Sequence, residues 1–108
     1  MIVVTMNDIP GYEVEEVIGE VFGLTVRSRN WASTILTGLR SAFGGELKGY
    51  TLMLVDSRQQ GIQRLIEEAE AKGANAIIAM RFDSGQLGGQ WNEICAYGTA
   101  VKVKKVGE

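Results

Sequence analysis

Three arginines in the first half of the chain carry side chains suited to binding an anion. Arg27, Arg29 and Arg40 could gather around a carboxylate or a phosphate, because a guanidinium group donates paired hydrogen bonds to both. They could equally form ion pairs, within or between subunits, with the acids of the same part of the chain, which are Glu13, Glu15, Glu16 and Glu20. The sequence leaves both readings open.

A pair of glycines before an acid is a second candidate. The backbone N–H groups of Gly44, Gly45 and Glu46 could hold an anion ahead of a following helix. The simpler reading is a helix end and a tight turn, with Glu46 at the positive end of the next helix. Glu46 is therefore a candidate ligand-binding residue with a structural alternative.

Tyr50 and Arg58 are a third candidate, since residues eight positions apart lie near the same face of a helix. An arginine beside an apolar stripe often crosses a subunit interface, where it binds carboxylates or backbone carbonyls. The alternative is that both residues line a ligand pocket.

The missing residue types exclude much of enzyme and metal chemistry. With no histidine and a single cysteine, the chain cannot hold a Ser-His-Asp triad, a Cys-His pair or a zinc site within one subunit. We expect Cys95 to lie in a buried strand, where it acts as a small hydrophobic residue. We expect Asp83 and Glu93 to be solvated acids, with the binding of a hard cation as the alternative. We predict that the protein is not an enzyme. The sequence identifies no metal and no cofactor.

Composition describes an ordinary globular chain. A length of 108 residues predicts a single domain over residues 1–108. The composition, with 45% hydrophobic and 22% charged residues, excludes an intrinsically disordered chain. A net charge of −2 argues against nucleic-acid binding. No stretch predicts a membrane span or a secretory signal, and a lone cysteine fits the reducing cytoplasm, which is the expected location.

The apolar spacing predicts the elements that must position the candidate residues. Residues 2–5 form a short strand, and residues 12–26 form one long bent strand or two short ones, where Gly19 and Gly23 mark bulges or close backbone approach. Residues 31–43 repeat as a helix. A strand buried on both faces follows at 74–82, then a glycine-rich loop at 84–90 and a last strand at 91–106.

The segment 46–72 is ambiguous. Residues 57–72 have a helical apolar stripe that ends at Gly73, while residues 50–55 favour a strand by propensity. Leu47, Tyr50, Leu54 and Gly61 also lie near one stripe, which allows a single helix of 27 residues.

A series of short motifs, taken together, resembles the YbjQ-like family of small bacterial and archaeal proteins, which carries a heavy-metal-binding label. The likeness runs from about residue 18 to residue 103. The motifs are Arg27-Ser28-Arg29, Gly38-Leu39-Arg40, Gly44-Gly45-Glu46, Tyr50-Thr51, Arg58, Gly73-Ala74-Asn75-Ala76, Arg81-Phe82 and Tyr97-Gly98-Thr99-Ala100-Val101.

The resemblance implies an α+β subunit similar to dodecin-like folds: N-terminal strands, a short helix, a single long helix over 46–72 and two C-terminal strands, assembled as a ring-shaped homopentamer. Trp31 and Trp91 could stack on a planar ligand as in dodecin-like flavin binders, or pack in a core or interface. Asn30 stands where relatives often carry a histidine, which removes the most natural metal ligand.

We therefore expect a cytoplasmic, non-enzymatic homo-oligomer that binds a metal ion or a small anionic ligand between subunits. The self-association is expected to give a homopentamer, and a decamer of two stacked rings is left open. The alternative function is a scaffold or protein-interaction module with no small-molecule ligand.

Overall fold

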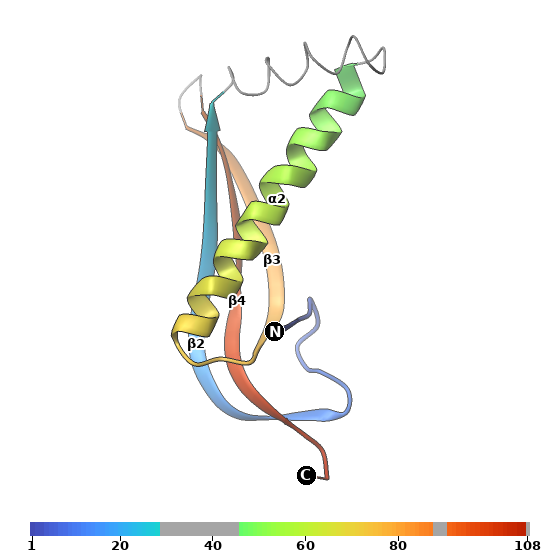
Figure 1. The fold of residues 1–108 in the computed structure, drawn as a ribbon, viewed down its shortest axis with the longest axis vertical. Helices are drawn as coiled ribbons and strands as arrows, with labels where there is room; N and C mark the ends of the chain where they lie inside the picture. The colour runs from blue at the N-terminus through green and yellow to red at the C-terminus, as the bar shows by residue number, and fades with distance from the viewer. Residues whose placement is uncertain (29–45, 88–90, 108) are drawn as a thin grey trace.

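A four-stranded sheet carries one long helix on one face in the computed structural model, which describes residues 1–28, 46–87 and 91–107 (Figure 1). The strands lie in the order β1-β3-β4-β2, parallel between β1 and β3 and antiparallel elsewhere. This confirms the α+β class. The elements are β1 (Ile2–Val3), β2 (Tyr12–Ser28), α2 (Glu46–Ala71), β3 (Ala76–Leu87) and β4 (Trp91–Lys105).

β2 is a single bent strand, which settles one alternative that the sequence left open. Its pairing with β4 shifts register between Val14 and Glu16 and again between Val17 and Gly19. Gly19 has φ +136°, a backbone conformation that residues with a side chain rarely adopt. The expected bulge at Gly19 is therefore confirmed.

β3 is longer than the sequence predicted. The prediction of a loop from residue 84 is wrong for residues 84–87, which belong to the strand. Pairing with β4 continues without interruption from Arg81 opposite Tyr97 to Leu87 opposite Trp91. Hydrogen bonds along this antiparallel ladder outweigh the weak strand preference of Ser84 and Gly85. The predicted double burial is confirmed at the start of β3, where Ala76 and Ile77 are both fully buried.

α2 is one continuous helix of 26 residues, as the family resemblance implied. Its buried residues recur every four positions. In a helix with 3.6 residues per turn, positions four residues apart differ by about 40° around the helix axis, so the buried stripe winds around α2. Such a winding stripe suits the oblique course of α2 across the sheet (Figure 1). Leu54, expected on this stripe, is instead exposed. The stripe consists of Met53, Ser57, Gly61, Leu65 and Ala69.

Two apolar clusters lie on opposite faces of the sheet. The larger one packs under α2, and the smaller one packs with the N-terminal segment, where Ile9 lies against β3 and β4. The N-terminal segment is tied to β3 by hydrogen bonds from Ala79 N–H to the Met6 carbonyl and from Met80 N–H to the Val4 carbonyl. The larger cluster contains Val21, Leu65, Ala69, Ala74, Ile77, Ala96 and Ala100; the smaller contains Ile9, Ala76, Val101 and Val103.

Side chains of α2 satisfy backbone groups at the open edge of β2. The Phe22 N–H donates to Glu68 Oε2 at 3.1 Å, and Arg64 Nη1 donates to the Leu24 carbonyl. β2 is the last strand of the sheet that the described residues form, so within that part of the chain these groups have no neighbouring strand to pair with. The two bonds fasten α2 to the strand on either side of Gly23.

Gly23 marks the closest approach of α2 to the sheet, which confirms the close backbone approach expected there. A Cβ atom on Gly23 would lie far inside van der Waals contact with the Gly61 carbonyl oxygen and the Leu65 nitrogen, and 3.0 Å from the Arg64 carbonyl carbon. All three are backbone atoms, which cannot rotate away. A residue with any side chain at position 23 would therefore push α2 off the sheet.

The short helix expected at 31–43 lies outside the described residues. Among the residues that are described, no helix is long and apolar enough to cross a membrane.

Gly23→Ala is expected to destabilise the protein by about 3 kcal/mol, the upper end of the usual overpacking penalty, because only the backbone could move to make room. Gly61→Ala is the matched control. Its Cβ would lie 3.5 Å from the Gly23 oxygen and 3.6 Å from the Ala96 Cβ, which are ordinary contacts. Since alanine is more favourable than glycine inside a helix, the free energy of unfolding of this variant should rise by about 0.5–1 kcal/mol.

Urea unfolding at one fixed protein concentration measures both changes. Equal midpoints for Gly23→Ala and the unchanged protein would contradict the tight crossing.

Candidate functional site

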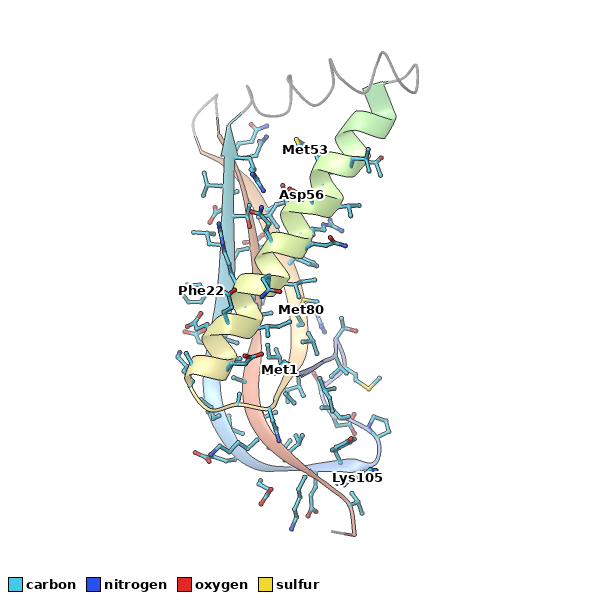
Figure 2. All side chains as sticks on the ribbon, viewed as in Figure 1. Met1, Phe22, Met53, Asp56, Met80 and Lys105 are labelled. Atoms are coloured by element: carbon cyan, nitrogen blue, oxygen red, sulfur yellow. The ribbon has the colours of Figure 1, made fainter. Side chains whose placement is uncertain are left out.

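A cavity of about 360 Å³ lies between the N-terminal half of α2 and the sheet end formed by β2, β3 and β4. The volume falls within the range of small-molecule sites. Met53 and Asp56 mark the stretch of α2 above it (Figure 2). The residues around the cavity are Thr25, Arg27, Met53, Leu54, Ser57, Arg58, Phe82, Ser84, Gly85, Gln86, Asn92, Glu93 and Ile94.

Strand alternation arranges the residues that face α2 in three rows that run across β2, β4 and β3, and the cavity lies over the second and third rows. Inward positions recur at every second residue, and the strand register aligns them. Polarity rises from row to row, away from the tight crossing of α2. The rows are Gly23, Ala96 and Phe82; then Thr25, Ile94 and Ser84; then Arg27, Asn92 and Gln86.

The oblique course of α2 opens space over the second and third rows. α2 runs in the opposite direction to β2, and its N-terminal half leaves β2 (Figure 1). Ser57 lies about 6 Å from Gly61 along the helix at 1.5 Å per residue, and Thr25 lies about 7 Å from Gly23 along the strand at 3.3 Å per residue. The hydroxyl-bearing residues of helix and strand therefore lie at a similar level, one turn beyond the crossing.

Two buried hydroxyl groups lie at the inner end of the cavity. Thr25 is 2% exposed and Ser57 is 3% exposed. Within the described part of the chain, Thr25 Oγ1 has no hydrogen-bond partner. A buried hydroxyl that lacks a partner costs about 1–3 kcal/mol of stability. The Thr25 hydroxyl oxygen is fully enclosed by protein, so it lies in the wall of the cavity and does not face its open space.

In the part of the chain that the structure describes, the ionic side chains that face the cavity are guanidinium groups. Arg27 Nη2 lies 3.0 Å from Asp56 Oδ2 and joins β2 to α2. Arg58 lies over the Phe82 ring, with its guanidinium carbon 5.1 Å from the ring centroid. Strand alternation places the Glu93 side chain on the opposite face of β4, the one that carries Cys95. Among the described residues, the charge facing the cavity is thus positive, and Asp56 compensates part of it.

Of the predicted site residues, the structure brings Arg27 and Arg58 together at this cavity. Glu46 and Tyr50 lie in the first two turns of α2, in a part whose side chains are not described, and Arg29 and Arg40 lie outside the described residues.

Within the subunit, two of the early acids pair with lysines and not with the arginines; pairing between subunits stays a prediction. Glu13 Oε1 lies 3.2 Å from Lys104 Nζ, and Glu16 Oε2 lies 3.8 Å from Lys102 Nζ. The register of β2 against β4 sets each acid directly opposite its lysine.

Sequence reasoning missed Thr25, Ser57 and Phe82 as site residues. None of them is unusual alone. The signal was the alternation in β2, where small and polar residues at 23, 25 and 27 interleave with apolar residues at 22, 24 and 26. The structure turns the first set inward and the second set outward.

Cys95 lies on the outer face of the sheet, opposite Leu24 on one side and Asp83 on the other. Burial raises the pKa of the Cys95 thiol, and the negative charges of Glu93 and Asp83 raise it further. The thiol therefore stays protonated at neutral pH. Among the described residues, no group of three or more His, Cys, Asp or Glu side chains is placed to hold a metal ion.

Comparisons with known proteins agree with the sequence resemblance. Residues 1–104 match the model of the YbjQ-like family described as "Putative heavy-metal-binding". A UPF0145 protein from Acidothermus cellulolyticus is 60% identical over 106 residues, covering 98% of each chain. One from Streptomyces griseus is 57% identical over 106 residues, covering 98% of this chain and 88% of the relative.

A crystal structure of a Pediococcus pentosaceus protein of unknown function, assigned to the DUF74 family, shares the fold. The TM-score is 0.57 at 15% identity, over 96% of this chain and 98% of that one. The family match covers nearly the whole chain, and the relatives share more than half of its residues over almost all of its length. The chain therefore belongs to the YbjQ-like family, whose curated members are named UPF0145 proteins.

Proposed function

We propose that the protein is a homo-oligomer without catalytic activity that binds a small anionic molecule in the cavity under α2. The observation that carries this proposal is the cavity itself, which is lined by two guanidinium groups together with hydroxyl and amide side chains. Such a set can recognise an acidic molecule through charge-assisted hydrogen bonds.

The cavity side chains support binding better than catalysis. In the described part of the chain, the lining residues carry hydroxyl, amide, guanidinium or apolar groups, apart from Glu93, whose side chain strand alternation turns to the other face of β4. A guanidinium group does not release its proton near neutral pH, and a hydroxyl needs a neighbouring base to act as a nucleophile. The proposal therefore contains no chemical step.

The described residues do not suit the heavy metal that the family description implies. A heavy metal prefers thiolate, thioether or imidazole ligands. The chain has no histidine, and the one thiol is held protonated on the other face of the sheet. At the cavity, Met53 supplies a single thioether. We therefore favour an organic anion over a metal ion as the ligand.

Apolar surfaces on two sides of the molecule support self-association. On the outer face of the sheet, Phe22 is 53% exposed and projects from β2 (Figure 2). It is flanked there by further exposed apolar residues, and the exposed side of α2 carries a second set. Apolar patches of this kind mark contact surfaces. The sheet set is Phe22, Leu24, Val26 and Tyr97; the helix set is Leu52, Leu54 and Val55.

Two different surfaces in contact generate a ring when the rotation between copies closes. We propose that the sheet set of one subunit contacts the helix set of the next, and that five subunits close the ring, the number that the family resemblance implies. Leu54 belongs to the helix set and also borders the cavity. The ligand would then lie between subunits.

The alternative function uses the same ring as a scaffold for a protein partner, with the cavity unused. The free Cys95 fits a reducing compartment, and the cytoplasmic location stays a prediction.

Native mass spectrometry of the untagged protein tests the proposed function. The expected result is a five-subunit mass, or ten if two rings stack, with one organic increment per subunit. A bare five-subunit mass that also gains nothing from added organic acids would favour the scaffold. A mass increment that matches a metal ion would support heavy-metal binding instead. A folded monomer would contradict the proposed ring.

Phe22→Lys should break the ring, because a charge would then be buried in the proposed subunit contact. Its backbone bond to Glu68 does not depend on the side chain, so the subunit should keep its fold. Size-exclusion chromatography with light scattering and circular dichroism measure the two properties. Val106→Lys is the control, since Val106 is also an exposed apolar residue but belongs to neither set. Rings of unchanged size in Phe22→Lys would refute this contact.

Alkylation of Cys95 should be slow near neutral pH and should accelerate only above the pH at which an ordinary thiol reacts, because only the thiolate reacts. The double variant Asp83→Asn/Glu93→Gln should lower the pH at which alkylation accelerates. That pH should stay above the one for an ordinary thiol, because burial is the largest cause of the raised pKa of Cys95. Asp8→Asn/Glu70→Gln, which removes two exposed acids elsewhere, should leave it unchanged. Native and urea-unfolded protein showing the same pH–rate profile would contradict the raised pKa.

A further inference from the structure

We infer that the N-terminal segment determines which face of β3 lines the cavity. Residues 4–9, called the strap below, hold a bulge in the middle of β3, and this bulge sets the register of the half of β3 that borders the cavity. The link to ligand binding rests on the proposed function. The effect of the strap on the register does not.

β3 changes face halfway along its length. Ile78 and Met80 are two positions apart, which in a regular strand places two side chains on the same face. Yet Ile78 packs with the smaller apolar cluster, and Met80 packs with the larger one on the opposite face. From Ile78 to Arg81, three steps along β3 correspond to two steps along β4. β3 therefore contains one extra residue at this point, which is a β-bulge.

The bulge holds an alanine in a conformation that favours glycine. Ala79 has φ +54°, in the left-handed region where the Cβ atom is crowded by the backbone. Such strain persists only where surrounding contacts hold it in place. On the β4 side the bulge is tightly packed against Gly98, where a Cβ would lie 2.8 Å from Ile77 Cγ2 and 3.3 Å from Met80 Cα.

Two backbone hydrogen bonds join the bulge to the strap. The Ala79 N–H donates to the Met6 carbonyl at 2.8 Å. The Met80 N–H donates to the Val4 carbonyl at 3.0 Å. In a regular strand only every second N–H points to a given neighbour, whereas here two successive N–H groups point to the same segment. This pair of bonds therefore requires the bulge.

Two side chains anchor the strap. Arg81 Nη1 donates to the Thr5 carbonyl at 2.6 Å and to the Met80 carbonyl at 2.9 Å, so one guanidinium group bridges the strap and the bulge. Ile9 is buried in the smaller apolar cluster, against β3 and β4. The strap is thus held at one point by a charge-assisted bond and at another by apolar burial.

The register of the second half of β3 decides which of its residues line the cavity. With the bulge, Phe82, Ser84 and Gln86 border the cavity, and Asp83 lies on the outer face. Without the extra residue, this half would slip by one position against β4. A slip of one residue turns every side chain to the other face, so Arg81 and Asp83 would face α2 and Phe82 would turn outward.

The second half of β3 is the half that can slip. Ala76 and Ile77 in the first half are fully buried. Asn75, just before them, binds the Val103 backbone of β4 through both atoms of its side-chain amide, at 2.8 and 2.9 Å. Residues 83–86 are exposed and have no such anchor in the apolar clusters. Release of the strap should therefore move residues 81–87 and leave residues 76–78 in place.

A slip would also change the chemistry of the cavity. It would add the Asp83 carboxylate to the lining, and this charge would repel an anionic ligand. It would also remove Phe82 from its place under Arg58. Ala79 and Arg81 are therefore positioning residues for the proposed site, although neither lines it.

A disulfide between position 83 and Cys95 reports the register. Asp83 lies directly opposite Cys95. Residues opposite each other in an antiparallel pair have Cα atoms about 4.5–5.5 Å apart, which is within the range of a disulfide. In Asp83→Cys, the oxidant diamide should link the two thiols within one chain, and mass spectrometry after alkylation and unfolding counts the thiols that remain. After a slip, position 83 would face α2 and no bridge should form.

Three variants, each combined with Asp83→Cys, test the strap. Arg81→Met/Ile9→Ala removes both anchors and should slow bridge formation at least about 10-fold, as expected for the loss of a hydrogen bond to a charged group. Ala79→Val should slow it with both anchors present, because a β-branched side chain resists a positive φ. Adding Ala79→Gly to the variant without anchors should restore the rate, because glycine forms the bulge without strain.

Arg64→Met/Ile62→Ala is the matched control. It also removes a guanidinium bond to a backbone carbonyl, that of Leu24, and an apolar side chain that packs on a cluster, but both belong to α2. Its bridging rate should equal that of Asp83→Cys alone. Circular dichroism checks each fold, and if the variant without anchors is unfolded, Ala79→Val decides. Failure of Asp83→Cys itself to form the bridge would overturn the inference.

The outcomes separate this inference from the proposed function. Native mass spectrometry of the variant without anchors should show a smaller organic increment, which Ala79→Gly restores. Unchanged bridging rates in this variant and in Ala79→Val would overturn the inference and leave the proposed function standing. Slower bridging with an unchanged increment would overturn the link to binding alone. If the unaltered protein retains no organic molecule, the proposed function and that link fail together, and the bridging rates still decide the role of the strap.

Discussion

The contact between the backbones of α2 and β2 at Gly23 and Gly61 is the constraint on which the rest of the molecule depends. It brings the helix closer to the sheet than any side chain at position 23 would allow. The bonds of Glu68 and Arg64 to neighbouring backbone groups of β2 hold the same point. A helix fixed at one point and crossing obliquely must leave the strand beyond that point, so the tight crossing and the cavity next to it have one cause.

The alternation in the second half of β2 connects the cavity with the proposed assembly. In a sheet with one wet face, apolar residues normally turn toward the core. Here Thr25 and Arg27 turn inward, while Phe22, Leu24 and Val26 turn outward. A monomer gains nothing from exposing the apolar set. Both halves of the pattern make sense together if a neighbouring subunit covers the outer face and a ligand fills the polar space inside.

Much of the fold could be predicted because it depends on local patterns. Apolar alternation and turn residues gave the strands, and Gly19 and Gly23 were correctly linked to a bulge and a close approach. The full length of β3 could not be predicted, because Ser84 and Gly85 owe their strand conformation to the distant β4. Arg27 and Arg58 could be named by their chemistry. Thr25 could not, since a threonine inside a strand is ordinary until the register shows that it lies buried beside open space.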